Sequence, residues 1–102
     1  MGMNSMKKIT AKELEKNLEE NKHSKIKILL EGIINYNLEI DNAKIINEHN
    51  YISICNFEDR TQTIKFNIHQ IMKIEQIDNE KFQINFDLLQ IAQLKIVEKN
   101  IA

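Results

Sequence analysis

The side chains best suited to metal binding or nucleophilic catalysis are a few histidines and a single cysteine, and they are widely spaced. His23, His49 and His69 lie twenty or more residues apart, and Cys55 has no second cysteine nearby. Zinc and iron–sulfur sites need such ligands at short, regular spacing. Cys55 could be a nucleophile only with His49 beside it in space, and nothing in the sequence builds an oxyanion hole. We therefore expect no catalytic residue, no metal site and no cofactor.

Carboxylates and glycines give no stronger indication of an enzyme. The paired carboxylates, such as Glu58 and Asp59, fall in predicted turns or on a predicted helix surface, where acidic residues are common. A phosphate-binding loop needs several glycines. Gly32 is the only glycine after residue 2, so nucleotide binding in the familiar modes is poorly supported.

Lysines and one tyrosine form the best candidate patch for nucleic acid. Lys25, Lys27 and Lys65 are predicted to point outward from strands, and Tyr36 could stack on a base. The chain has 14 basic and 15 acidic residues and a formal net charge of −1. That balance provides no general attraction for phosphate or for an anionic membrane. A solvated face of lysine and glutamate explains the same pattern, so nucleic-acid binding is the alternative function.

Protein binding needs less specialised chemistry. An isoleucine-rich sheet tends to leave an open edge or an apolar patch, and both are docking sites. Four residues are out of phase with the predicted inward face, although a second core under the helix would also explain some of them: Leu29, Ile33, Ile46 and Met72. We expect Tyr51, Phe57 and Met72 to be partner-binding residues, and self-association through an edge strand could form a homodimer.

One helix is predicted to precede the strands. Thr10 and Glu13 have the spacing of a capping box, and Leu14 and Leu18 continue an apolar stripe, so residues 10–21 are predicted to be helical. The stripe is too narrow to hold an isolated helix in water, so the helix must pack on the rest of the domain. Residues 1–8 are predicted to be a disordered terminus or sequence added during cloning, which leaves a single domain at 9–102.

From residue 25 to 97 the apolar period changes to two, which predicts a series of short strands. Gly32 is predicted to mark a bulge or a sharp bend, and Asn and Asp replace Gly and Pro in the turns. A single 3₁₀ turn is expected at 69–71, between two strands. Residues 88–97 fit either a helix capped by Asp87 or a strand, with a strand favoured for the second half. The fold class is α+β and mainly β, with the helix on a small antiparallel barrel or strongly bent sheet of six or seven strands.

Residues 44–75 carry a resemblance to known small barrels. The stretch runs through Tyr51–Ile54 and a turn at Asp59–Arg60, and its end reads Ile64-Lys65-Phe66-Asn67-Ile68-His69-Gln70-Ile71-Met72-Lys73-Ile74-Glu75. It resembles the strand, short helical turn and strand that close Sm-like and SH3-like barrels, and it is similar to the C-terminal region of the YolD-like proteins of Gram-positive bacteria and their phages. The glycine that is frequent before the second strand is replaced by Asn42-Ala43, and residues 80–102 have no counterpart. The resemblance implies a barrel and is nearly silent on function.

Composition and hydropathy complete the expectations. Ile, Lys and Asn supply 45 of the 102 residues, a bias typical of A/T-rich coding sequence. We find no apolar run long enough for a membrane helix and no signal peptide, so we expect a cytoplasmic protein of an A/T-rich bacterium or phage. The most favoured function is a small non-enzymatic module that binds another protein, as an inhibitor or accessory factor; the alternative is an Sm-like nucleic-acid-binding barrel.

Overall fold

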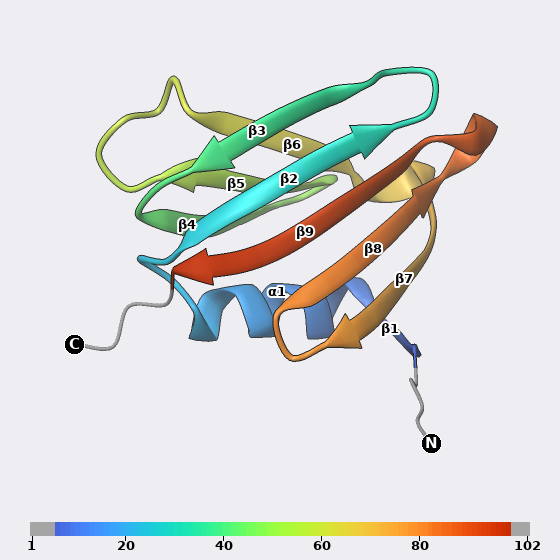
Figure 1. Cartoon of the computed structure of the whole chain (residues 1–102), viewed down its shortest axis with the longest axis horizontal. Helices are drawn as coiled ribbons and strands as arrows, with labels where there is room; N and C mark the ends of the chain where they lie inside the picture. Colours follow the sequence, from blue (N-terminus) through green and yellow to red (C-terminus); the bar gives the residue numbers. More distant parts are fainter. Residues whose placement is uncertain (1–5, 99–102) are drawn as a thin grey trace.

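The chain folds into a six-stranded and a three-stranded antiparallel sheet with one helix beside them (Figure 1). The computed structural model describes residues 6–98. Its elements are β1 (Lys7–Ile9), α1 (Ala11–Glu20), β2 (Lys25–Glu31), β3 (Tyr36–Ile40), β4 (Ala43–Glu48), β5 (Tyr51–Asn56), β6 (Thr63–Asn67), the 3₁₀ turn η1 (Ile68–Gln70), β7 (Ile71–Asp78), β8 (Lys81–Phe86), the 3₁₀ turn η2 (Asp87–Leu89) and β9 (Ile91–Glu98). The strand order is β1-β7-β8-β9-β2-β3 in the large sheet and β4-β5-β6 in the small one.

The expected class, mainly β with one helix, is confirmed, but the expected closed barrel is not. Closure would require both edge strands of the large sheet to pair with those of the small one, whereas in residues 6–98 β3 pairs only with β2, β1 only with β7, and β6 only with β5. The chain leaves the large sheet at Asp41–Asn42, where Asn42 has φ +48°, and starts a separate sheet. A period of two reads the same in a barrel and in two facing sheets, so strand patterning could not distinguish them. The described residues form nine strands, whereas six or seven were expected.

A single hydrophobic core fills the space between the sheets. Alternate residues of each strand point into it, as the period of two predicts. The fully buried side chains include Ile28, Phe82 and Leu94 from the large sheet and Ile52 and Ile54 from the small one. Apolar packing therefore holds the two sheets together, and backbone hydrogen bonds join them at one end, where Ala43 N donates to Ser24 O at 2.9 Å and His23 N donates to Ala43 O at 2.8 Å.

Helix α1 closes one side of the sandwich and packs on β4 (Figure 1). The predicted capping box is confirmed: Thr10 Oγ1 accepts from Glu13 N at 3.1 Å, and Thr10 N donates to Glu13 Oε1 at 2.9 Å. The backbone hydrogen bond from Thr10 is the main cause that lowers the pKa of Glu13. Leu14 and Leu18 are the buried residues of the helix, so the narrow stripe is anchored by the sheet as expected.

Three segments turned out differently or more definitely than the sequence indicated. Lys7 and Lys8, placed in a disordered terminus, form β1 with Ile9 and pair with β7; residues 1–5 lie outside the described part. The 3₁₀ turn expected at 69–71 is η1, one residue earlier. The uncertain segment after Asp87 is a single 3₁₀ turn followed by the full strand β9.

A search of the described residues for a helix that is both long and apolar enough to cross a membrane finds none.

Candidate functional site

The sandwich is open at the end where the β2–β3 loop, η1 and η2 come together (right-hand side of Figure 1). A cavity of about 360 Å³ lies there between the two sheets. We call its apolar lining the mouth: it consists of Leu30, Ile33, Ile34, Ile64, Phe66 and Phe86. Polar side chains, including Gln70, Asp87 and Gln90, also line the cavity. A mostly apolar cavity with a few polar groups is the usual composition of a ligand or peptide site.

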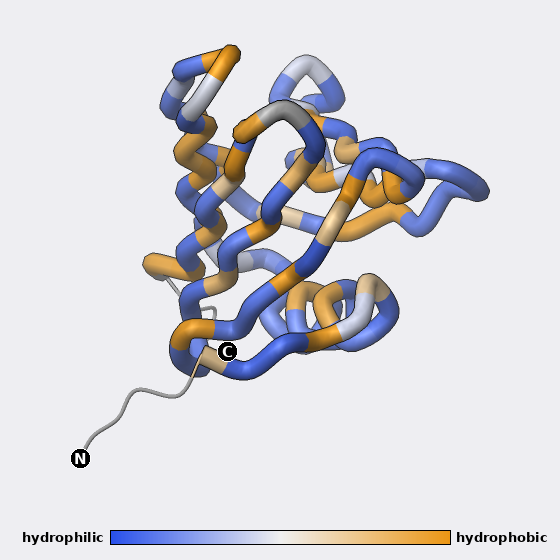
Figure 2. Tube along the Cα trace, turned by 90° about the vertical axis from the view of Figure 1, so that its right-hand side faces the viewer, coloured by the Kyte–Doolittle hydropathy of each residue, from blue (hydrophilic) through white to orange (hydrophobic). Residues whose placement is uncertain are grey.

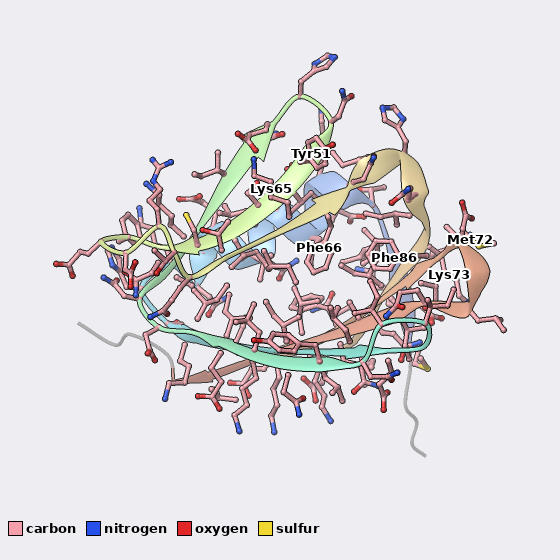
Figure 3. The ribbon with its side chains drawn as sticks, turned by 90° about the horizontal axis from the view of Figure 1, so that it is seen from above. Tyr51, Lys65, Phe66, Met72, Lys73 and Phe86 are labelled. Atoms are coloured by element: carbon pink, nitrogen blue, oxygen red, sulfur yellow. The ribbon has the colours of Figure 1, made fainter. Side chains whose placement is uncertain are left out.

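Two phenylalanines from opposite sheets form the floor of the mouth. Phe66 comes from β6 and is buried, whereas Phe86 ends β8 and is half-buried. Their ring centroids are 5.6 Å apart and the planes are tilted by 30°, and Figure 3 shows the two side chains between the layers. Tilted aromatic pairs of this kind offer a large, well-ordered apolar contact surface.

The β2–β3 loop holds two isoleucines in water at the rim of the cavity. Ile33 is 68% and Ile34 is 60% exposed. Gly32 N donates to Asn35 Oδ1 and Asn35 Nδ2 donates to Gly32 O, which closes the loop on itself. Ile34 N donates to Gln90 Oε1 at 2.7 Å, and Gln90 Nε2 donates back to Ile34 O at 2.9 Å. The isoleucines are thus presented by a loop that is tied to Gln90, just before the neighbouring strand β9 of the same sheet.

The η2 turn adds a second exposed apolar element next to the first. Leu89 is 90% exposed and has φ +63°. A left-handed conformation costs a leucine about 1–2 kcal/mol. Because the side chain is exposed, packing contacts within the protein do not compensate for this cost. Met72, which is 68% exposed, lines a neighbouring depression together with Leu89, Phe86 and Gln90. Figure 2 looks onto this end and shows hydrophobic segments in its loops. We call Ile33, Ile34, Met72 and Leu89 the apolar rim.

The three residues predicted to bind a partner are not brought together. Met72 belongs to the apolar rim. Tyr51 lies on the outer surface of the small sheet, where Lys65 Nζ is 5.7 Å from its ring centroid (Figure 3). Phe57 lies by the Asp41–Asn42 corner, half-buried and stacked on His23 at 4.1 Å between centroids. Of the predicted set, the structure places only Met72 beside the mouth.

The predicted nucleic-acid patch is also divided between the sheets. Lys25 and Lys27 are near neighbours on β2, and each Nζ is 3.7 Å from a carboxylate oxygen of Glu39. Lys65 is on the small sheet, 3.1 Å from a glutamate of β4. Tyr36 is the first residue of β3 and lies opposite Leu30. It therefore belongs to the other face of the sheet from Lys25 and Lys27. The four residues therefore form no single basic surface, and three of them already have anionic partners.

Cysteine and histidine are placed as structural residues. Cys55 is 1% exposed, so its thiol is not accessible to a substrate in this structure. His23 Nδ1 lies 2.7 Å from Asn42 Oδ1, and His69 Nε2 lies 3.0 Å from Asn50 Oδ1. Across residues 6–98 no group of three or more His, Cys, Asp or Glu side chains gathers as metal ligands would.

One organised charge pair lies on the outer face of the small sheet, close to the mouth. Glu48 Oε1 is 3.1 Å from Lys65 Nζ and accepts a hydrogen bond from Ser53 Oγ at 3.0 Å. The hydrogen bond with Lys65, followed by that from Ser53, lowers the pKa of Glu48 below its ordinary value. The lysine ammonium is therefore held over β5, on the outer face of the small sheet.

The sequence pattern indicated some residues of the apolar rim and gave no indication of the others. Ile33 and Met72 were recognised as out of phase with the core. Ile34 was missed, although two adjacent isoleucines between Gly32 and Asn35 are unusual in a turn, where polar residues dominate. Leu89 gave no signal, because leucine has no preference that would predict a left-handed conformation.

Compared with known proteins, the chain matches no family model, no curated protein and no solved structure.

Proposed function

We propose that this protein is a protein-interaction module, rather than an enzyme, and that it binds an apolar segment of a partner at the mouth. One observation carries the proposal: a tethered loop presents Ile33 and Ile34 to water at an apolar cavity, and Leu89 is exposed at the adjoining depression. Apolar side chains at an opening contribute little to folding. Surrounded by polar residues, such a surface is characteristic of protein-binding sites.

The site suits binding because its loops are already held in place before a partner arrives. The hydrogen bonds between Gln90 and Ile34 already hold one side of the opening. A preformed site avoids part of the entropic cost of association. An aliphatic or aromatic anchor from the partner would contact Phe66 and Phe86 while the rim residues close around it, which is the arrangement of a binding hot spot.

The expected affinity of the mouth alone is modest. Full burial of an exposed aliphatic side chain yields about 1.5–3 kcal/mol, so the rim isoleucines and Leu89 together supply roughly 5–9 kcal/mol. Association costs an estimated 4–15 kcal/mol. The gain from the apolar contacts is therefore of the same size as the cost of association, and a tight complex needs additional interactions at the same place.

Selection from a phage-displayed random peptide library tests this function. We expect enriched peptides that carry aliphatic or aromatic residues and whose addition shifts the amide resonances of the β2–β3 loop, β6 and η2. A double variant, Ile33→Ser with Ile34→Ser, should bind the selected peptide at least tenfold more weakly, about 1.4 kcal/mol. Tyr51→Ser, outside the cavity lining, is the matched control and should bind within threefold of the unmodified protein.

Two results would overturn the proposal. One is a library that yields no peptide, and the other is a selected peptide that binds the double variant as tightly as the unmodified protein. Titration with oligothymidylate tests the alternative in parallel. Nucleic-acid binding that falls steeply with salt and is unaffected by the double variant would favour that alternative over a protein partner.

A further inference from the structure

Strand β6 has an open edge beside the mouth. In residues 6–98 its only strand partner is β5, so the opposite edge carries backbone groups that no described strand engages. Such an edge is a template for pairing with another extended chain. Lys65 and Asn67 of this strand also line the cavity, which places the open edge and the apolar site in contact.

The hydrogen bonds with β5 show which residues of β6 face the open edge. Asn56 N donates to Gln62 O at 3.1 Å, and Ile68 N donates to Asn50 O at 2.9 Å. Hydrogen-bonded pairs alternate along an antiparallel ladder, so the even-numbered residues of β6 pair with β5. The backbone N–H and C=O groups that point to the open edge are therefore those of Thr63, Lys65 and Asn67.

We propose that the partner contributes an extended segment that adds to this edge as a further strand of the small sheet. The proposal rests on the function proposed above and specifies the kind of segment that the mouth accepts. Addition of a strand supplies main-chain hydrogen bonds for affinity while alternate side chains enter pockets for specificity. It thus provides the interactions that the apolar contacts lack.

The side chains of β6 define the sequence that this segment must have. Ile64 and Phe66 line the mouth, whereas the Lys65 side chain points to the outer surface (Figure 3). In a paired strand, the residue opposite Lys65 shares its outward direction, and its two neighbours point into the mouth. The matching segment is therefore apolar–acidic–apolar, with the acidic residue opposite Lys65, where it would share the lysine ammonium with Glu48.

Charge makes a second copy of this chain an unsuitable occupant. Two β6 edges related by a two-fold axis would place Lys65 opposite the Lys65 of the other copy, because Lys65 is the middle residue of the three that face the edge. Like charges directly opposite one another destabilise a strand pair. The other open edge in this region, β3, contributes no residue to the cavity lining. We therefore assign the site to a different protein.

N-methylation of the selected peptide, one residue at a time, tests strand addition. A methyl group removes one N–H donor, and in a paired strand only alternate residues donate to the partner. We expect roughly tenfold weaker binding for methylation at one set of alternate positions and little change at the other set. If methylation left the affinity unchanged at every position, strand addition would be overturned, and the mouth would bind the peptide through side-chain contacts alone. Failure to select any peptide would instead overturn the proposed function.

A double-mutant cycle tests the acidic residue. Lys65→Gln in the protein and Glu→Gln in the peptide should each weaken binding about threefold, with little further loss when combined, as for a partly exposed ion pair. Lys44→Gln, on β4, is the control and should change nothing. Additive losses would overturn the pairing with Lys65. Sedimentation should show a monomer at the concentrations used; a dimer that the peptide dissociates would overturn the assignment to a different chain.

Discussion

The two ends of the sandwich differ in what they expose to water. At the corner end, where β3 leads into β4, the side chain of Asn56 organises the backbone: its Nδ2 donates to Asp41 O at 2.7 Å, and its Oδ1 accepts from Glu58 N and Asp59 N. At the mouth end, Gln90 organises the backbone in a similar way. Within the described part of the chain, however, the rim of exposed aliphatic residues is at the mouth end alone.

This difference shows that exposed apolar surface is not required to build a sheet end in this fold. The corner is closed by polar side chains that satisfy the turns, with one stacked ring pair, His23 and Phe57. The mouth satisfies its turns equally well and still places leucine and isoleucine in solvent. Exposed aliphatic residues of this kind are the basis on which we propose that this end binds a partner.

The largest expected effect is that of Gly32→Ala at the mouth. Gly32 has φ +138°, and a Cβ there would lie 2.5 Å from the carbonyl oxygen of Leu89. We expect a loss of about 3 kcal/mol in the free energy of unfolding, measured by urea denaturation. Glu31→Ala, at the neighbouring exposed position, is the control and should stay within about 0.5 kcal/mol. A similar small loss for Gly32→Ala would show that the two loops are not held together as described.

At the corner, Asn56→Ala should cost about 2–3 kcal/mol, because a buried side chain loses hydrogen bonds to several backbone groups. Chemical denaturation measures the loss, and Glu58→Ala is the control for a neighbouring exposed side chain. The comparison predicts that the folded fraction of the Asn56 variant still binds the selected peptide normally. Weaker peptide binding by the folded fraction of this variant would mean that the two ends of the sandwich are coupled.

Leu89→Gly should raise stability, by about 0.5–1 kcal/mol, because glycine adopts φ +63° without the steric cost that leucine bears. The same variant should bind the peptide severalfold more weakly, since the rim loses its most exposed side chain. Leu29→Gly is the control: it lies within β2 and is half-buried, so glycine there should lower stability. An unchanged peptide affinity for Leu89→Gly would remove this residue from the site.

The smallest effect concerns the ion pair beside the mouth. The pKa of Glu48 is lowered in the folded protein relative to the ordinary 4.5, so its ionised form stabilises the fold above that value. This contribution is lost as the pH falls through the lowered pKa. Glu48→Gln should therefore reduce the melting temperature at pH 7, and the difference should shrink toward zero in strong acid. Glu20→Gln is the exposed control, and a difference independent of pH would contradict the ion pair as its cause.

Several elements were predictable because short-range interactions determine them. Thr10 and Glu13 make their capping box within one turn of helix, and Asn67 begins the 3₁₀ turn by accepting a hydrogen bond from the backbone of His69. The apolar alternation of β2 and β8 followed the inward and outward faces of the large sheet, whereas the central strand β5 is buried on both faces from Ile52 to Asn56. The candidate site was less predictable: Met72 was identified, whereas Tyr51 and Phe57 lie elsewhere.

The sequence by itself determined the helix, the strand segments, the polar turns and the inward-facing residues, because each depends on neighbours a few positions away. Only the tertiary structure decided that two sheets face each other without closing, because the pairing of β3 and β6 is a long-range choice that a period of two does not encode. The tertiary structure also decided where the apolar rim lies, because the β2–β3 loop, η2 and the start of β7 come together only when the sheets pack.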